Sequence, residues 1–405
     1  MKSRVSKKIF PLIVLVLAVT LFGLQLNRHI DDPIRADEAA WIFSSVYLDH
    51  YMAGEWNHPD WNHMDAIDHP PVVKYYYGLA VKSAGELWKT TDDKDWWFRS
   101  SQKISPMTFQ SGMEERISWP VLRSCRIAVA LAAVLASLAL YFLGSAVWKP
   151  SFGLASSIFF LSSQLVLYFV PIVEPDFLLI AVTLLQAVFL VRWMKGFGWW
   201  DALMAAILVG IAIDTKLSGL IQVPVSVLAI SVVIFQRRFD RRSILQSSVI
   251  VVIGFVVMIL LNPTLHSPVD GLVKMVEHRY MQAVAVSQLS GLANIPIVDS
   301  IIVAAKYLFV DFGLIVDRVW LPFGFILSLI GGVYLVYNLI SAKGRSGSVL
   351  CVIFMALLWG LLSFYSFSKT LWLRYLLPTS PYLAMVMGCA VLKLLSRDKR
   401  PPISV

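Results

Sequence analysis

Two adjacent carboxylates, Asp37 and Glu38, follow closely after the first long apolar run of the chain. Neighbouring residues point to different sides of a helix or strand, so one carboxylate can face a site while the other serves a second role. A carboxylate at the edge of a membrane can act as a general base or hold a metal ion. A helix N-cap with a solvated neighbour gives the same pattern, and the pair alone favours that plainer interpretation.

A second polar group consists of Asp68, His69, Pro70 and Pro71, with Lys74 about one helical turn further on. Two prolines after an aspartate are typical of a helix N-terminus. The unpaired backbone N–H groups at such an end attract anions, and His69 and Lys74 would stand beside them. A simple turn with a capping aspartate is the alternative. The combination of Asp, His and Lys favours a binding site.

Glu174 and Asp176 flank a proline in a short segment between two apolar runs. Carboxylates this close to a membrane interior are costly to bury unless they are paired or used. A solvated polar turn explains the pattern equally well. This segment alone does not decide between a functional and a plain interpretation.

Positive side chains stand at the ends of apolar runs where orientation rules do not place them. Arg123 and Arg126 begin one run, Lys216 begins a later one, and Lys369 and Arg374 flank the start of the last. Positive residues are expected mainly on the cytoplasmic side. Several cations near carboxylates predict a bound anion, such as a lipid phosphate at the level of the headgroups. The alternative for any one of them is snorkelling to outer-leaflet phosphates, which explains the whole set less well.

The elements that would carry these residues are membrane helices. Hydrophobic residues make up 58% of the 405 residues and charged residues 15%, and the mean hydropathy is +0.69. A soluble domain is more polar, and apolar runs of about 17 to 22 residues recur, each long enough to span a bilayer as a helix. The net charge of +9 comes from basic clusters at helix ends, which indicates membrane orientation and no nucleic-acid binding. The sequence therefore predicts an all-α, polytopic transmembrane helical bundle.

We expect about ten spans, with both termini in the cytoplasm. An N-terminal signal peptide is the alternative for the first run, but no small-residue cleavage site follows it convincingly. The ambiguous segment 301–316 is placed on the membrane surface, because the basic residues after it then turn inward. The expected spans are 9–26, 125–147, 152–170, 177–193, 199–213, 217–235, 244–261, 320–340, 349–367 and 375–395.

This topology gives one transmembrane domain over residues 1–405, with the chemistry on its outer side. The first outer loop is 27–122 and the second is 262–319. Residues 70–88 should form an amphipathic helix that lies on the membrane surface, with Lys74 away from its apolar side. The shorter segments 171–176, 214–216 and 368–374 should reach the same face.

In this order, six short motifs resemble the GT-C superfamily of membrane glycosyltransferases, and within it the protein O-mannosyltransferases and the aminoarabinose transferases of lipid A. The likeness covers most of the membrane region. We expect neither the large soluble insertion of the eukaryotic mannosyltransferases after Asn262 nor the extra C-terminal domain of the aminoarabinose transferases. The motifs are Asp37-Glu38, His69-Pro70-Pro71 with Lys74, Leu122-Arg123, Glu174-Pro175-Asp176, Thr215-Lys216-Leu217-Ser218-Gly219 and Arg374-Tyr375-Leu376-Leu377-Pro378.

The resemblance implies an inverting transfer of a sugar from a polyprenyl-phosphate donor to a hydroxyl or phosphate of a glycan, lipid or protein. It implies an integral protein of the cell inner membrane with an extracytoplasmic active site and surrounding membrane lipids as partners. No certain cofactor follows, and a divalent metal is left open. By analogy, Asp37 is the catalytic base and Glu38 assists it; Lys74, Arg123, Lys216 and Arg374 bind the donor phosphate; and His69, Glu174 and Asp176 bind substrate.

Two other functions compete with the enzyme. A transporter or flippase for a glycolipid or small solute would place its ionisable residues near the bilayer midplane, usually on broken helices. The charges here gather at one face instead, which favours the enzyme. The third alternative is a non-catalytic glycan-binding protein of the same fold.

Overall fold

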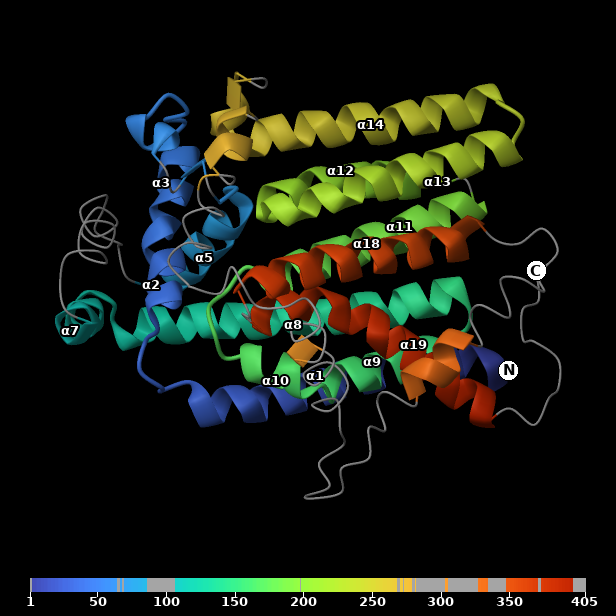
Figure 1. Ribbon diagram of the computed structural model, residues 1–405, viewed down its shortest axis with the longest axis horizontal. Helices are drawn as coiled ribbons and strands as arrows, with labels where there is room; N and C mark the ends of the chain where they lie inside the picture. Colours follow the sequence, from blue (N-terminus) through green and yellow to red (C-terminus); the bar gives the residue numbers. More distant parts are fainter. Residues whose placement is uncertain are drawn as a thin grey trace.

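The computed structural model describes residues 2–63, 66–67, 69–85, 106–196, 198–267, 270–271, 273–278, 281, 303–304, 327–333, 347–370 and 373–395. Every regular element within these residues is a helix (Figure 1), so the predicted all-α class is confirmed. The long helices run side by side along the longest axis of the molecule. They are α1 (Lys2–His29), α8 (Trp119–Val147), α9 (Pro150–Leu161), α11 (Asp176–Gly196), α12 (Trp199–Thr215), α13 (Gln222–Gln236), α14 (Arg241–Leu261), α18 (Gly347–Thr370) and α19 (Ser380–Leu395).

Seven helical segments within the described residues are long and apolar enough to cross a membrane, which supports an integral membrane protein. Large apolar side chains such as Leu131, Val251 and Leu361 remain exposed on their surfaces, where lipid would cover them. The seven are Ile9–His29, Trp119–Val147, Asp176–Gly196, Leu217–Gln236, Arg241–Leu261, Gly347–Ser366 and Arg374–Leu395.

The other three expected spans are not confirmed. The run 152–170 divides into α9 and the short α10 (Gln164–Phe169), because α9 ends before Ser162 and the Ser163 hydroxyl caps α10 by accepting from Val166 N. Helix α12 has 17 residues, at the short limit for a span. Most of 320–340, and most of the ambiguous 301–316, lie outside the described residues.

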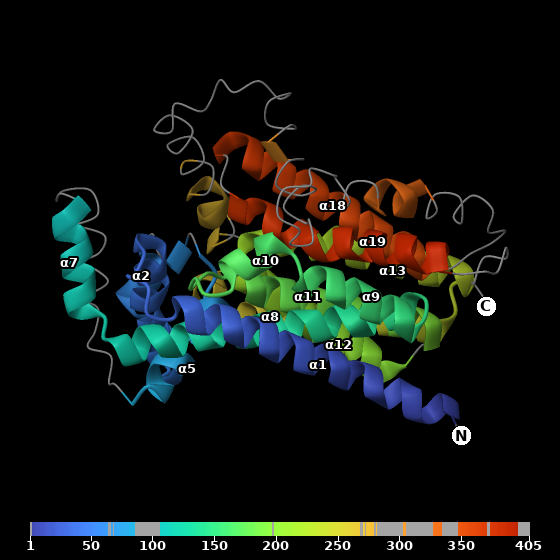
Figure 2. The same ribbon diagram turned by 90° about the horizontal axis from the view of Figure 1, so that it is seen from below.

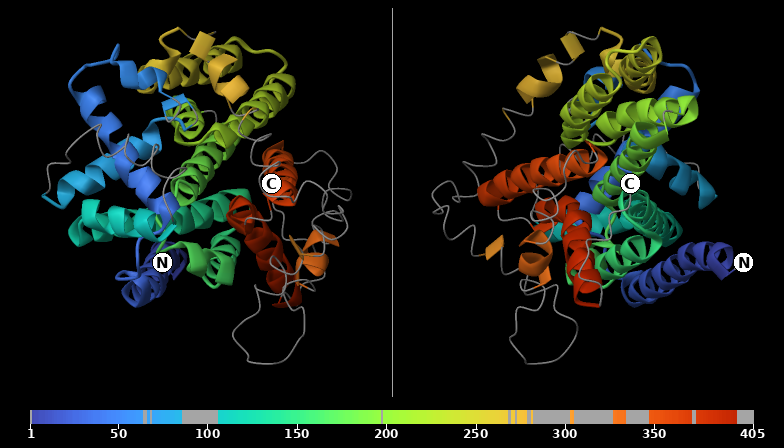
Figure 3. Two further views of the ribbon diagram at one scale, coloured as in Figure 1. Left: turned by 60° about the vertical axis from the view of Figure 1, so that its left-hand side comes forward. Right: turned by 90° about the vertical axis from the view of Figure 1, so that its right-hand side faces the viewer.

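Close helix contacts hold the bundle together. Helices α8 and α9 approach at Gly144 and Gly153, where a Cβ on Gly144 would meet the Gly153 Cα at 2.7 Å. Small residues allow such approach where apolar burial alone does not drive helices together. Helix α1 lies at the edge of the bundle (Figures 2 and 3) and packs on α8 and α9.

Four short helices gather at one end of the bundle, away from the N-terminal end of α1 (Figures 1 and 2). They are α2 (Ala36–Phe43), α3 (Tyr47–Met52), α5 (Val72–Ser83) and α7 (Pro106–Arg116). The turns before α11, after α12 and before α19 reach the same end, because ion pairs join them to one another and to α2. The segments expected on one face of the membrane are thus brought together.

Helix α5 occupies the middle of the expected amphipathic helix 70–88, and its location on a membrane surface stays a prediction. It packs on α8 and α3, and Gly78 permits this because a Cβ there would meet the Leu48 Cβ at 2.6 Å. The prediction that Lys74 stands away from the buried side is wrong. Lys74 is fully buried, with its ammonium 4.3 Å from the centroid of the Tyr47 ring, a cation–π contact that offsets part of the desolvation.

Candidate functional site

Arg374 joins two carboxylates that are far apart in the sequence. It lies in η7 (Leu373–Thr379), and its Nη1 donates to Asp37 Oδ2 at 2.7 Å and to Glu174 Oε1 at 3.1 Å. Asp37 is in the first turn of α2, and Glu174 is in the turn before α11. Three residues from separate motifs therefore meet, with the two carboxylates sharing the guanidinium group of Arg374.

A second ion pair stands beside the first. Lys216 Nζ lies 2.8 Å from Asp176 Oδ1, and both side chains are largely buried. The Tyr375 ring links the pairs, because its centroid is 5.6 Å from the Arg374 guanidinium carbon and 5.8 Å from Lys216 Nζ. Asp37, Glu174, Asp176, Lys216 and Arg374 are called the charged cluster below.

Glu174 is the carboxyl of this cluster best suited to carry a proton near neutral pH. Burial raises its pKa to about 7, the Arg374 guanidinium opposes that shift, and the Asp176 and Asp37 carboxylates add to it. Its Oε2 is buried and has no hydrogen-bond partner among the described residues. The Tyr77 hydroxyl donates to the Glu174 carbonyl oxygen at 2.6 Å and fixes the turn that presents the side chain.

Glu38 faces away from the charged cluster. Its carboxylate accepts four hydrogen bonds, from Arg126 Nε and Nη2 at 3.0 and 2.8 Å, from Val173 N at 3.1 Å and from Arg35 N at 3.0 Å. Arg126 Nη1 also donates to the carbonyls of His29, Ile30 and Asp32. Glu38 and Arg126 thereby tie the turn after α1 to α8 and to the turn that carries Glu174.

The remaining candidates lie around this framework. Arg123 is exposed on α8, one turn before the buried Arg126, and the structure does not bring it into the charged cluster. The His69 ring packs against Trp41 of α2 with centroids 4.6 Å apart, so it borders the helix that carries Asp37. Asp68 lies outside the described residues.

Sequence reasoning missed several residues here. Arg126 was grouped with Arg123, although its spacing from the buried Leu122 and Val129 could have marked it as inward-facing. Asp214 is fully buried, accepts from Asn262 Nδ2 at 3.2 Å, and has its pKa raised well above the usual value by burial. Nothing in the sequence distinguished it from a helix-end aspartate.

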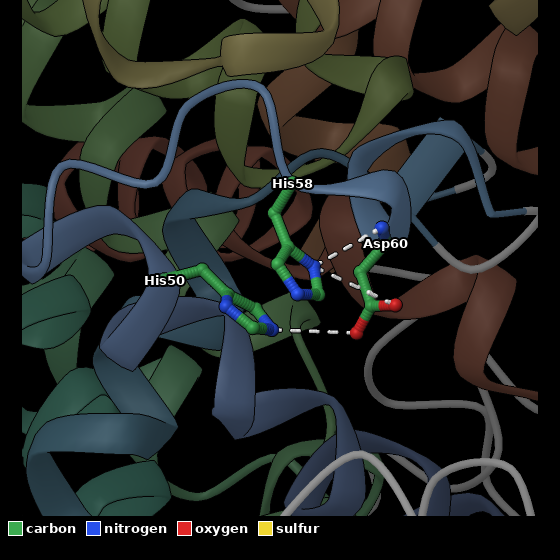
Figure 4. Close-up of side chains that lie close together, drawn as sticks. All are labelled: His50, His58 and Asp60. Atoms are coloured by element: carbon green, nitrogen blue, oxygen red, sulfur yellow. Dashed lines mark hydrogen bonds and ion pairs between the residues drawn. The ribbon is translucent and has the colours of Figure 1, made fainter.

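The charged cluster does not fit a divalent metal ion. Arg374 and Lys216 already occupy the space between its carboxylates, and both would have to withdraw for an ion to bind. Among the described residues, the one His/Asp group with metal-ligand spacing is elsewhere, at His50, His58 and Asp60 (Figure 4).

Comparison with known families gives one match. Residues 117–266 match the model of the family described as dolichyl-phosphate-mannose-protein mannosyltransferase. The matched region includes Arg123, Glu174, Asp176 and Lys216. No curated protein matches the chain.

Solved membrane transferases resemble the chain over almost its whole length. ArnT from Cupriavidus metallidurans, bound to undecaprenyl phosphate, is 16% identical with a TM-score of 0.50, over 95% of this chain and 60% of that one. The oligosaccharyltransferase AglB from Archaeoglobus fulgidus, with an inhibitory peptide and a dolichol-phosphate, is 12% identical with a TM-score of 0.56, over 97% and 50%. Its complex with zinc and sulfate gives 12% and 0.55, over 95% and 49%.

At such identities the likeness shows a shared fold. The chain spans about half to three fifths of the length of these solved proteins. Together with the family match, this fold confirms the expected resemblance to the GT-C membrane glycosyltransferases.

Proposed function

We propose that the chain transfers a sugar from a polyprenyl-phosphate donor to an acceptor hydroxyl or phosphate on the outer face of the membrane, with inversion at the anomeric carbon. The observation that carries the proposal is the meeting of Asp37 and Glu174 on Arg374, next to the Lys216–Asp176 pair. Cations and carboxylates at one end of a membrane bundle suit a reaction whose leaving group is an anion.

The donor class rests on the cations and on the likeness to known transferases. ArnT and AglB were solved with undecaprenyl phosphate and a dolichol-phosphate, both phosphates of long isoprenoid chains. Arg374 and Lys216, both close to the Tyr375 ring, would bind such a phosphate. Arg123, exposed near the same end of α8, would meet the phosphate or a headgroup from outside.

Asp37 is assigned as the base. Its side chain is 58% exposed, so an acceptor can approach it, whereas that of Glu174 is 9% exposed. The acceptor oxygen attacks the anomeric carbon while the bond from that carbon to the phosphate oxygen breaks. The bonding electrons leave with the phosphate, and the acceptor proton passes to Asp37. Arg374 and Lys216 stabilise the charge that develops on the leaving phosphate.

Arg374 couples donor binding to this base. Its Nη1 is paired with Asp37 and Glu174. An arriving phosphate competes for the guanidinium, and the exposed Asp37 is the partner more easily displaced, because solvent replaces its lost bond. Donor binding would then release Asp37 to accept a proton.

Glu38, expected to assist in catalysis, is better suited to a positioning role. Its four hydrogen bonds already occupy both carboxylate oxygens. By fixing the first turn of α2, it sets the direction of the adjacent Asp37. His69, against Trp41, and Asp176, paired with Lys216, are kept as proposed substrate contacts.

The test uses the full chain in lipid nanodiscs with a panel of polyprenyl-phosphate sugars and a set of glycan, lipid and peptide acceptors. Release of polyprenyl phosphate, measured by mass spectrometry, is expected with at least one donor and should be lost in Asp37→Asn. Absence of release from every donor, together with donor-sugar movement across proteoliposomes, would instead favour a transporter.

A further inference from the structure

Residues 47–62 pack around a small apolar cluster that also includes Val46, Ala66 and Tyr75 of α5. Tyr47, Leu48 and Trp61 are buried in a cluster separate from the main core of the bundle. Around it, His50 of α3, Asp60 of η2 (Pro59–Asn62) and His58, the residue before η2, lie close to one another (Figure 4). None of these residues belongs to the charged cluster.

The three side chains are spaced as metal ligands. One ligand atom from each lies within 4.8 Å of the others. His50 Nε2 is 3.3 Å from Asp60 Oδ2, and His58 Nδ1 is 3.7 Å from Asp60 Oδ1. Ligands of a tetrahedral ion with bonds of about 2.0–2.1 Å stand roughly 3.3–3.5 Å apart, so small side-chain rotations would close the shell.

A carboxylate on the far side of His50 orients its ring. Glu55 Oε2 lies 2.7 Å from His50 Nδ1, and a carboxylate oxygen can only accept, so Nδ1 carries a proton. In a neutral ring the lone pair is then on Nε2, which faces Asp60. A histidine that binds a metal through one nitrogen almost always donates from the other to a carboxylate or carbonyl, as His50 does here.

His58 adds a second lone pair at the same place. The Asp60 backbone N–H donates to His58 Nδ1 at 3.3 Å, so this nitrogen acts as an acceptor although it also faces the Asp60 carboxylate. The two rings are stacked, with centroids 4.0 Å apart and planes 22° apart. Two protonated rings would repel each other in this arrangement. A cation that takes the His50 Nε2 lone pair, the Asp60 carboxylate and the His58 Nδ1 lone pair would replace the long hydrogen bond from Asp60 N–H to His58 Nδ1.

The backbone around these side chains is fixed by other bonds. The Tyr47 hydroxyl donates to the Asp60 carbonyl oxygen at 3.0 Å, and Trp61 Nε1 donates to the Glu55 carbonyl oxygen at 2.9 Å. These bonds fix the backbone at Glu55 and Asp60 without relying on the histidine side chains. Rigid support of this kind separates a binding site from a chance cluster of surface side chains.

We propose that His50, His58 and Asp60 bind a divalent transition-metal ion of the zinc type, with Glu55 orienting His50. Two imidazole nitrogens with one carboxylate favour zinc over magnesium or calcium, which prefer oxygen ligands. Three protein ligands leave one position for water.

The ion would stabilise the segment 47–62, which contacts the end of α14 and, through Tyr47, the side chain of Lys74. The Tyr51 hydroxyl donates to the Leu260 carbonyl oxygen at 3.2 Å, and the Trp56 ring packs edge-on against His266. Tyr47, bonded to the Asp60 carbonyl, also carries the Lys74 ammonium on its ring. The metal therefore acts as a clamp on this outer structure, independently of whether the charged cluster transfers a sugar.

The test measures metal binding directly. Full-length protein without a polyhistidine tag is purified in detergent, stripped with a chelator and titrated with Zn²⁺, with bound metal counted by mass spectrometry and Co²⁺ used as a spectroscopic substitute. About one ion per chain is expected, with a visible Co²⁺ spectrum of tetrahedral type. His50→Asn and Asp60→Asn should abolish binding, and Glu55→Gln should weaken it by about 10–100-fold while one ion still binds at saturation.

The matched control is His278→Gln, a histidine in another described helical segment, which should leave the titration unchanged. Size-exclusion chromatography checks that each variant is folded. His58→Gln, at a side chain 33% exposed, provides a binding variant that keeps the core intact. The proposal is overturned if the stripped wild type takes up no tightly bound ion, or if the His50, His58 and Asp60 variants bind as the wild type does.

Discussion

Arg126 donates two hydrogen bonds to the Glu38 carboxylate, from Nε to Oε1 at 3.0 Å and from Nη2 to Oε2 at 2.8 Å, and both side chains are almost completely buried. The same arginine donates to three carbonyls of the turn that follows α1. Glu38 in turn accepts from the backbone N–H of Val173, one residue before Glu174. One buried pair therefore sets the positions of Asp37 and Glu174, whose side chains meet at Arg374.

Breaking this pair should unfold the end of the bundle that carries the charged cluster. Because Arg126→Ala leaves an uncompensated buried carboxylate, we expect a loss of about 3–5 kcal/mol in the free energy of unfolding, measured by denaturant titration in detergent. The neighbouring Arg123→Ala, on the exposed side of α8, is the control and should change stability by less than about 0.5 kcal/mol. Equal losses in the two variants would contradict the framework role of Arg126.

Removing the carboxylate of Asp37 should stop turnover without unfolding the protein. Asp37→Asn keeps the size of the side chain and replaces an exposed group, so we expect normal stability and retained donor binding. The transfer rate should fall by about 10²–10⁴-fold, the range for loss of a general base. Polyprenyl-phosphate release and donor binding to the same preparation measure the two effects. Near-normal turnover would move the base to Glu174 or Asp176.

The orientation of the bundle can be tested with single cysteines at two exposed positions. Met52 is the last residue of α3, one of the short helices at the end of the bundle that carries the charged cluster. Phe239 lies in the turn between α13 and α14. The three native cysteines are buried and should give little background. A membrane-impermeant thiol reagent added outside should label Met52→Cys and not Phe239→Cys. The reverse pattern would place the charged cluster in the cytoplasm.

Much of the fold was predictable because membrane-spanning helices appear in the sequence as long apolar runs. Where polar side chains offer the backbone another partner, as Ser163 does within 152–170, the run breaks in a way that hydropathy does not detect. Arg374 and Lys216 were singled out because cations at helix ends expected to face outward are unusual. Asp37, Glu174 and Asp176 gave no decisive local signal, and the family resemblance assigned them roles. The pairing within the cluster was not found, because Arg374 and Asp37 are 337 positions apart and no local pattern joins them.

The group formed by His50, His58 and Asp60 was not predicted from the sequence at all. His50, His58 and Asp60 lie in a polar stretch with no recognised ligand motif, so spacing along the chain gave no signal. Only the folding of 47–62 around Trp61 brings the three together. The likeness to glycosyltransferases likewise gave Glu38 a share in catalysis, while its hydrogen bonds suit a framework residue.

Removing either cation of the charged cluster should lower the rate of sugar transfer, because each is proposed to contact the leaving phosphate. Arg374→Ala and Lys216→Ala should each lower turnover by about a hundredfold, as does removal of one donor to a developing anion. Arg374→Lys should recover only part of this, because lysine cannot make the bidentate contact with a phosphate that a guanidinium can make. Arg241→Ala, at the start of α14 and far from the cluster, is the control. Unchanged turnover in both Arg374→Ala and Lys216→Ala would remove the phosphate site.

Glu174 should make the stability of the protein depend on pH in a recognisable direction. Its pKa rises from the ordinary 4.5 to about 7 in the folded state, so between these values the folded chain holds a proton that the unfolded chain has lost. The contribution of Glu174 to stability is therefore fully present below about pH 4.5 and declines as pH rises through about 7. Thermal unfolding in detergent from pH 5 to 8 measures the decline. Glu174→Gln, which cannot ionise, should flatten it, whereas Glu277→Gln at an exposed position should not. A wild type and a Glu174→Gln variant with the same pH profile would show that Glu174 is already ionised at pH 5, and a role as proton carrier near neutral pH would be lost.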